Sequence, residues 1–159
     1  MGKLNAIVLL SLKKCGRGKN YTTLSPEKFN KLVDFALDNE IGVGFDSCSS
    51  HRFLNASKDR KNFWKIKSFI EACESFRMSV YIDVDGNVYP CSFCEGICQS
   101  DKFGQSKAFD WKNGINILSC NDFLTDIWHG SEKVIEWRNF LSETFDNFDN
   151  IQCPMFEVE

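Results

Sequence analysis

The sequence lacks three features that would assign it at once to a broad class: a strong charge of one sign, a membrane-length apolar run and a complete export signal. Its 159 residues carry a net charge of −3, which gives no reason to expect a broad nucleic-acid footprint. The apolar run at residues 4–12 is too short to cross a bilayer. A basic cluster at residues 13–19 follows it, with no small-residue cleavage site. We therefore expect a cytoplasmic globular protein with no membrane or nucleic-acid partner.

Histidine is also scarce, with two residues in the chain. His51 follows Cys48 by three positions and is a possible metal ligand, although a surface-loop role is the simpler interpretation. His129 stands where a helix is expected to end, a position at which imidazole interacts favourably with the helix dipole. No Ser-His-Asp or Cys-His-Asp grouping emerges from the sequence. The chain therefore offers no support for nucleophilic catalysis by a triad.

Cysteine, by contrast, is abundant. Its eight residues make up about 5% of the chain, which is above ordinary usage and below the level of small disulfide scaffolds. In a cytoplasmic protein, cysteines in such numbers indicate metal or redox chemistry. Cys73 and Cys91 stand in the pattern C-x12-G-x4-C, with Asp85-Gly86 at an expected turn. This pattern brings two thiols to one end of a hairpin.

The first part of the chain predicts a strand, a helix and a second strand. Residues 4–12 are apolar and rich in branched side chains, as in a parallel strand that is buried on both faces. Ser25 and Pro26 provide the cap and the first position of a helix that ends near residue 40. Residues 41–45 read as the second strand. The sequence thus predicts an α/β fold containing a βαβ unit with parallel strands.

Residues 46–62 are polar and irregular, so we place a domain boundary there, between a first domain at residues 1–60 and a second at residues 61–159. The second domain is expected to contain short helices, one hairpin and a long loop. These are a helix over residues 63–72, a hairpin of residues 80–84 and 87–89, a loop over 95–112, and helices over 121–128 and 131–142.

The hairpin geometry predicts which cysteines meet. In a two-residue loop, residue 84 faces residue 87, so Cys91 faces position 80. Cys73 precedes position 80 by seven residues and lies at the same end of the ribbon. One further chain crossing at this end would supply the remaining thiolates.

Two further ligands are predicted from their positions. Cys48 follows the second strand, at the edge of the sheet where α/β folds build their sites. Cys153 precedes a proline, as the last ligand of many ferredoxin-like motifs does. We therefore predict one [4Fe–4S] cluster with four thiolate ligands, which are Cys48, Cys73, Cys91 and Cys153.

The other cysteines leave alternatives open. Cys94, Cys98 and Cys120 are reserve ligands, and Cys15 in the basic cluster is expected to be free. Zinc is the main rival metal, because Cys91-x2-Cys94 has the spacing of a zinc knuckle. No second pair matches it, but a zinc site of Cys91, Cys94, Cys98 and Cys120 remains possible. Under that alternative the chain is a zinc-stabilised protein-interaction domain.

Four polar residues near the ends of the two predicted strands form a second candidate site. Arg17 and Lys19 lie in a glycine-containing loop, which lacks the G-x4-G-K-[S/T] frame of a phosphate loop. A solvated turn is the simpler interpretation. The alternative places both side chains at the C-terminal edge of the sheet, facing an anionic ligand or a cofactor carboxylate. Asp46 and Ser47 would then support the same pocket beside Cys48.

The C-x12-G-x4-C pattern resembles the opening motif of SPASM and twitch domains, the iron–sulfur modules at the C-terminus of many radical SAM enzymes. The resemblance implies that residues 4–49 correspond to the last strand–helix–strand portion of a partial (β/α)6 barrel. Residues 63–159 are similar to a short SPASM or twitch lobe with an auxiliary cluster. In that superfamily such modules position substrates or pass electrons. The full seven-cysteine SPASM pattern is not met after Cys91, so we expect one cluster rather than two.

The sequence departs from radical SAM enzymes because it lacks C-x3-C-x2-C, the motif of the cluster that cleaves S-adenosylmethionine. Cys91-x2-Cys94-x3-Cys98 has those gaps in reverse order. The resemblance therefore implies a module without independent catalysis, which uses S-adenosylmethionine only together with a partner. A truncated chain, a split gene and a degenerate fragment are open explanations, of which we favour the last two. We expect the partner to be a polypeptide that carries C-x3-C-x2-C, or a peptide or protein substrate.

Overall fold

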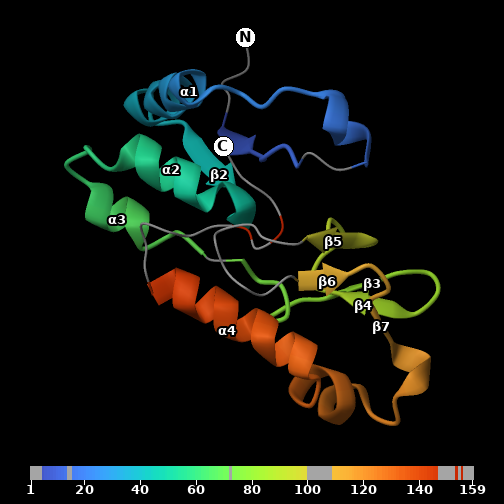
Figure 1. Ribbon diagram of the computed structural model, residues 1–159. Coiled ribbons are helices and arrows are strands. Elements are labelled where there is room, and N and C mark those ends of the chain that lie inside the picture. The colour runs from blue at the N-terminus through green and yellow to red at the C-terminus, as the bar shows by residue number, and fades with distance from the viewer. Residues whose placement is uncertain are drawn as a thin grey trace. The chain divides into compact units, whose positions relative to one another are not determined.

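The computed structural model describes residues 5–13, 16–71, 73–99 and 109–146, together with Cys153 and Met155 (Figure 1). The chain divides into two compact units. Unit 1 comprises Met1–Ala72 and Asn147–Glu159, and unit 2 comprises Cys73–Asp146. Both units combine helices with short strands, which confirms the predicted α/β class. Among the described residues, no helix has both the length and the apolarity that a membrane crossing requires.

Unit 1 begins with the predicted strand–helix–strand motif. Strand β1 (Ala6–Leu9) pairs in parallel with β2 (Gly42–Phe45). Helix α1 (Pro26–Asp38) connects them and packs against β2 and against α2 (Ser50–Ser57) (Figure 1). A short 3₁₀ helix, η1 (Gly16–Asn20), lies in the connection before α1. The predicted parallel βαβ unit is therefore confirmed.

The start of α1 follows from its sequence. The Ser25 side chain accepts a hydrogen bond from the backbone N–H of Lys28 at 3.4 Å. Pro26 occupies the first turn, where no intrahelical N–H bond is needed. The apolar positions that recur at helical spacing and are buried are Phe29, Val33 and Ala36. The predicted cap and first position of this helix are confirmed.

The predicted burial of the first strand on both faces is wrong. Leu9 is buried, but the side chains of Val8 and Leu10 are 66% and 74% exposed. Burial on both faces requires a sheet with several strands and a helix layer on each side. Among the described residues, β1 has a single strand neighbour, β2. One face of β1 therefore stays open to solvent.

The stretch at residues 46–62, predicted to be irregular, forms a 3₁₀ helix, η2 (Ser47–Ser49), and then α2. The Phe53 ring of α2 stacks on Phe45 with 4.5 Å between ring centroids. The helix is hard to recognise in the sequence because several of its buried residues are polar. These are Ser50, Arg52 and Ser57. The domain boundary placed in this stretch stays a prediction.

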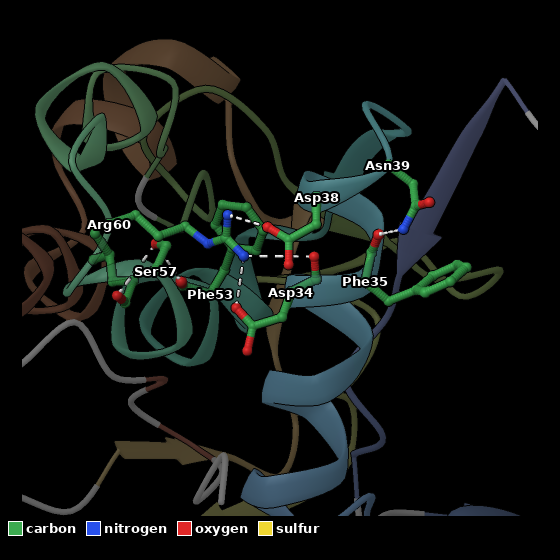
Figure 2. A network of polar contacts seen from close by, with 8 residues as sticks. Asp34, Phe35, Asp38, Asn39, Phe53, Ser57 and Arg60 are labelled. Atoms are coloured by element: carbon green, nitrogen blue, oxygen red, sulfur yellow. Dashed lines mark hydrogen bonds and ion pairs between the residues drawn. The ribbon is translucent and has the colours of Figure 1, made fainter.

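Arg60 holds the segment after α2 to α1 (Figure 2). Its guanidinium donates to Asp38 Oδ1 at 3.0 Å and to Asp34 Oδ1 at 2.7 Å. Within α2, the buried Ser57 hydroxyl donates to the carbonyl of Phe53 at 2.7 Å (Figure 2). Polar contacts thus help to hold this part of unit 1 together, whereas a helix predicted from its hydrophobic pattern would pack through a wide apolar face. The next helix, α3 (Phe63–Lys67), is shorter than predicted.

The described strands of unit 2 form two small antiparallel sheets. The first has the order β3-β4-β7, with β3 (Tyr81–Ile82), β4 (Asn87–Tyr89) and β7 (Ile115–Asn116). The second pairs β5 (Ile97–Gln99) with β6 (Phe109–Trp111). The loop predicted over residues 95–112 is therefore wrong near both ends, because the branched and aromatic residues there pair as strands. Residues 100–108 of that prediction lie outside the described residues.

The predicted hairpin is confirmed, but its predicted register is wrong by one residue. Tyr81 pairs with Tyr89, and the Asp83 N–H donates to the Asn87 carbonyl at 3.0 Å, which leaves a three-residue loop. Asp83 Oδ1 accepts from the backbone N–H groups of Asp85 and Asn87 at 2.9 and 2.8 Å. The hydrogen bonds from Asn87 are the main cause that lowers the pKa of the Asp83 carboxyl. The Asp83 side chain thus selects the longer loop.

The described part of unit 2 also contains η4 (Phe123–His129), a π-helix, and α4 (Glu132–Asp146). Asp122 caps η4, since its carboxylate accepts from the Thr125 N–H at 2.6 Å. Gly130 ends η4, and α4 follows directly. The core of the unit is aromatic. Trp111 and Trp137 meet edge to face at 5.8 Å between ring centroids, and both are buried.

Candidate metal centre

Cys73 lies at the start of unit 2, immediately before a tight turn that is closed by a bridge between Ser75 and Ser79. The N–H of Phe76 donates to the Ser79 carbonyl at 2.8 Å. Phe76 has a left-handed backbone with φ 52°, a strained conformation for a bulky residue. Its ring is fully buried against Trp111, with 5.3 Å between ring centroids. Burial of this ring therefore holds the turn that positions Cys73.

Arg138, on α4, fixes the same turn. Its Nε–H donates to the carbonyl of Phe76 at 2.6 Å. Its guanidinium also lies over the ring of Trp128, 4.4 Å from the ring centroid. The turn after Cys73 is thus held by side chains from distant parts of unit 2, and not by its local sequence alone.

The Cys73 thiol is half-buried, and its Sγ lies 2.9 Å from the Ser75 Oγ. Burial has the largest effect on its pKa and raises it. Hydrogen bonds with the hydroxyl and the backbone N–H of Ser75 act in the opposite direction, while the charge of Cys91 raises the pKa further. The last effect indicates that Cys73 and Cys91 lie close enough to interact electrostatically. Two of the predicted ligands are therefore within electrostatic range of each other.

Cys91 and Cys94 form a close pair directly after β4. Their Sγ atoms are 3.5 Å apart, and the N–H of Cys94 donates to the Cys91 carbonyl at 3.0 Å within a single turn. Cys94 is buried and Cys91 is half-buried. The residues before the pair anchor it in the core, and they are Val88, Tyr89 and Pro90. Unit 2 thus contributes three thiols from two segments, and none of the three forms a disulfide.

These thiols supply the donor type of an iron–sulfur cluster. In the part of the chain that the structure describes, no three His, Cys, Asp or Glu side chains are grouped as ligands of one metal ion. Sulfur is the donor type that iron–sulfur clusters require. The donor set of unit 2 therefore suits an iron–sulfur cluster.

Cys120 is separated from this group by the length of the hairpin. It follows a 3₁₀ helix, η3 (Ile117–Ser119), and the Ile117 N–H donates to the Gly86 carbonyl at the turn. Cys91 comes five residues after Gly86 along a largely extended segment, about 16 Å away at 3.3 Å per residue. The Cys120 thiol donates instead to the Ile117 carbonyl at 3.0 Å. This geometry does not favour a zinc site that joins Cys120 to Cys91.

Unit 1 contains the predicted residues Asp46, Ser47 and Cys48, which lie in or beside η2 after the end of β2. Sequence reasoning missed Lys13, whose buried ammonium pairs with Asp46 Oδ2 at 2.6 Å. Burial opposes the charge on Lys13, but contacts with Asp46 and Cys48 outweigh it and raise the Lys13 pKa. Burial also opposes the charge on Asp46, but Lys13 and Ser49 lower its pKa. The available signal was the position of Lys13 after β1, at the edge where parallel strands end.

Arg17 and Lys19, the predicted anion-binding pair, lie on η1, and both side chains are exposed. Asp46 forms its ion pair with Lys13. The role predicted for Arg17 and Lys19 beside a cofactor stays a prediction.

The predicted cluster ligands fall in both units. Cys73 and Cys91 belong to unit 2 together with Cys94, whereas Cys48 and Cys153 belong to unit 1. Cys153 is half-buried, as is Cys48. Cys98 lies on β5 opposite Asp110, but its side chain is not among the described parts of the chain. Cys15 lies outside the described residues.

A family model described as SPASM, an iron–sulfur cluster-binding domain, matches residues 73–154. The match starts at Cys73, ends one residue after Cys153 and covers slightly more than half of the 159 residues. It includes Cys91 and Cys94 and leaves out Cys48. The comparisons with curated proteins and with solved structures found no match. The chain therefore belongs to the SPASM family of iron–sulfur cluster-binding domains.

Proposed function

We propose that the chain is an auxiliary iron–sulfur module of a radical SAM-type enzyme. The observation that carries this proposal is the grouping of Cys73, Cys91 and Cys94 in one unit of a cluster-binding family member. The bound cluster passes electrons or positions a substrate. The 159 residues carry no C-x3-C-x2-C motif, so in this proposal they do not themselves cleave S-adenosylmethionine.

The cofactor in this proposal is one [4Fe–4S] cluster with four thiolate ligands. Cys73, Cys91 and Cys94 supply three of them. Cys153, the last cysteine within the stretch that matches the family, stays the predicted fourth ligand. Cys48 precedes that stretch, and its role as a ligand stays a prediction.

Metal and sulfide analysis after anaerobic purification tests this assignment. We expect about four iron and four sulfide ions per chain, together with the visible absorption of an iron–sulfur cluster. Replacing Cys73, Cys91 or Cys94 by serine should abolish or strongly reduce both contents. Cys120→Ser is the matched control, because Cys120 lies at the other end of the hairpin and should retain the cluster. Stoichiometric zinc without sulfide in the wild-type protein would overturn the assignment.

One observation favours a zinc-stabilised interaction domain as the second candidate. The Cys91 and Cys94 sulfur atoms are 3.5 Å apart. Two thiolates on one tetrahedral zinc lie ~3.8 Å apart when each Zn–S bond is ~2.3 Å long. In a cubane cluster each thiolate binds a different iron, which places the sulfur atoms farther apart. The same metal analysis therefore decides between the two candidates.

The proposed partner is a polypeptide that carries C-x3-C-x2-C and binds S-adenosylmethionine. The exposed Val8 and Leu10 side chains support this, as does the single strand neighbour that β1 has among the described residues, because further strands and helices would cover them. A peptide or protein substrate is the alternative partner.

Co-expression with polypeptides that carry the motif tests the partner proposal. Reductive cleavage of S-adenosylmethionine should increase when the chain is present, and Cys73→Ser should remove the increase. A chain that remains monomeric and leaves the cleavage unchanged would contradict the partnership. That result would not affect the metal and sulfide content, so the cluster proposal is judged separately.

A further inference from the structure

A continuous path of hydrogen bonds runs from the core of unit 2 to the Cys73 sulfur. The indole N–H of Trp137, on α4, donates to Ser75 Oγ at 2.9 Å. Ser75 Oγ in turn lies 2.9 Å from Cys73 Sγ. Trp137 is 1% exposed and Ser75 is 3% exposed, so both bonds are shielded from water. In such surroundings a hydrogen bond has a stronger electrostatic effect than at the surface.

The chemistry of the three groups fixes the direction of each bond. An indole nitrogen donates and cannot accept, so Ser75 Oγ is the acceptor in its bond with Trp137. The single hydroxyl hydrogen of Ser75 therefore remains for another acceptor. A cysteine that binds a metal has lost its proton and can only accept. With a cluster bound, the Ser75 hydroxyl must donate to the Cys73 sulfur.

We propose that Ser75 and Trp137 are positioning residues that raise the reduction potential of the cluster bound through Cys73. This inference rests on the proposed function. A hydrogen bond to a ligand sulfur favours the reduced cluster, because reduction adds a negative charge that the O–H dipole stabilises. Trp137 acts through Ser75, since its N–H orients and polarises the hydroxyl.

A purely structural role for the two residues makes a different prediction. Trp137 would then fill the aromatic core and Ser75 would close the turn, so their replacement would lower stability without changing the potential. The backbone N–H of Ser75 also bonds to the Cys73 sulfur, and it remains in every variant at these positions. Any change in potential therefore reports the side-chain path.

The test is a redox titration of the loaded protein, monitored by electron paramagnetic resonance. Ser75→Ala is expected to shift the equilibrium between reduced and oxidised cluster about tenfold, a fall of about 59 mV for one electron. Trp137→Phe should lower the potential by less, because the hydroxyl remains. The double variant should match Ser75→Ala, because Trp137 acts only through that hydroxyl.

Trp111→Phe is the matched control. Trp111 is as buried as Trp137, and the two rings are in contact. Within the described residues, the indole nitrogen of Trp111 has no hydrogen-bond partner. Its replacement removes the same atoms from the same core but breaks no bond to Ser75, so any effect through packing on Phe76 should lower the potential by less than Trp137→Phe does. An equal fall in Trp111→Phe and Trp137→Phe would assign the effect to packing and overturn the inference.

Iron and sulfide content separates this inference from the proposed function. Loaded Ser75→Ala and Trp137→Phe proteins with the wild-type potential would overturn the inference alone. A wild-type chain that binds no iron and sulfide would overturn the proposed function, and the inference with it. If Ser75→Ala does not load, the comparison of Trp137→Phe with Trp111→Phe decides the outcome.

Discussion

Replacing Phe76 by alanine and by glycine should reverse the usual order of stability of these two residues. At most positions glycine is less stable than alanine by about 0.5–1 kcal/mol, because it loses more conformational freedom on folding. Phe76 has a left-handed backbone with φ 52°. There the Cβ of alanine costs about 1–2 kcal/mol, and glycine avoids that cost.

Loss of the buried aromatic ring accounts for most of the expected decrease in the free energy of unfolding. The Phe76 side chain is fully buried and contacts Trp111, and truncation of a buried phenylalanine costs about 3–5 kcal/mol. We therefore expect Phe76→Ala to lower the free energy of unfolding by about 4 kcal/mol. Phe76→Gly should be about 1 kcal/mol more stable than Phe76→Ala, because the strain term exceeds the entropy term.

Urea unfolding followed by tryptophan fluorescence measures both values, since three of the four tryptophans lie in unit 2. Phe140 provides the matched control, because it is buried within α4 and has helical geometry. There Phe140→Gly should be less stable than Phe140→Ala by about 1 kcal/mol. If glycine is also the less stable replacement at Phe76, the strained turn that positions Cys73 is not real.

The elements that could be predicted from the sequence are those fixed by short-range chemistry. Ser25 and Pro26 determine the start of α1 through the first turn, and Asp122 does the same for η4. Asp85-Gly86 predicts the hairpin because this dipeptide favours a tight turn. Each signal acts within about four residues, so no knowledge of the rest of the chain is needed.

The errors concern contacts that the local sequence does not specify. The exposure of Val8 depends on how many strands flank β1, which no property of residues 6–9 determines. Helix α2 buries several serines, and Arg60 in the segment after it reaches back to Asp34 on α1. A hydrophobic pattern cannot reveal such a helix. The hairpin register depends on one hydrogen-bonded side chain, that of Asp83.

In the candidate site, too, short-range features could be predicted from the sequence and long-range contacts could not. The proximity of Cys73 and Cys91 follows from a spacing that one hairpin converts into geometry, although the register shifts by one residue. Ser75 and Trp137 had no signal in the sequence, because their hydrogen bond joins residues 62 positions apart. Lys13 and its partner are 33 positions apart. A motif search finds residues that could bind a metal, but it does not find those that set the properties of the bound metal.

Three further substitutions test polar contacts. Asp122→Ala removes the cap of η4 and should lower the midpoint of urea unfolding, and an unchanged midpoint would contradict the capping role. The lowered pKa of Asp83 adds stability above the unfolded value of about 3.9, and this is lost as pH falls through the folded pKa. Asp83→Asn should therefore flatten the Tm profile on the acid side, whereas an identical profile would refute this. Lys13→Met leaves the Asp46 carboxylate without its buried ammonium partner and should cost about 3 kcal/mol, measured by circular dichroism. Lys31→Met is its control, because Lys31 forms an ion pair of the same 2.6 Å length with side chains 74% and 77% exposed and should cost about 0.5 kcal/mol. Equal losses for the two lysines would show that burial does not decide the strength of these ion pairs.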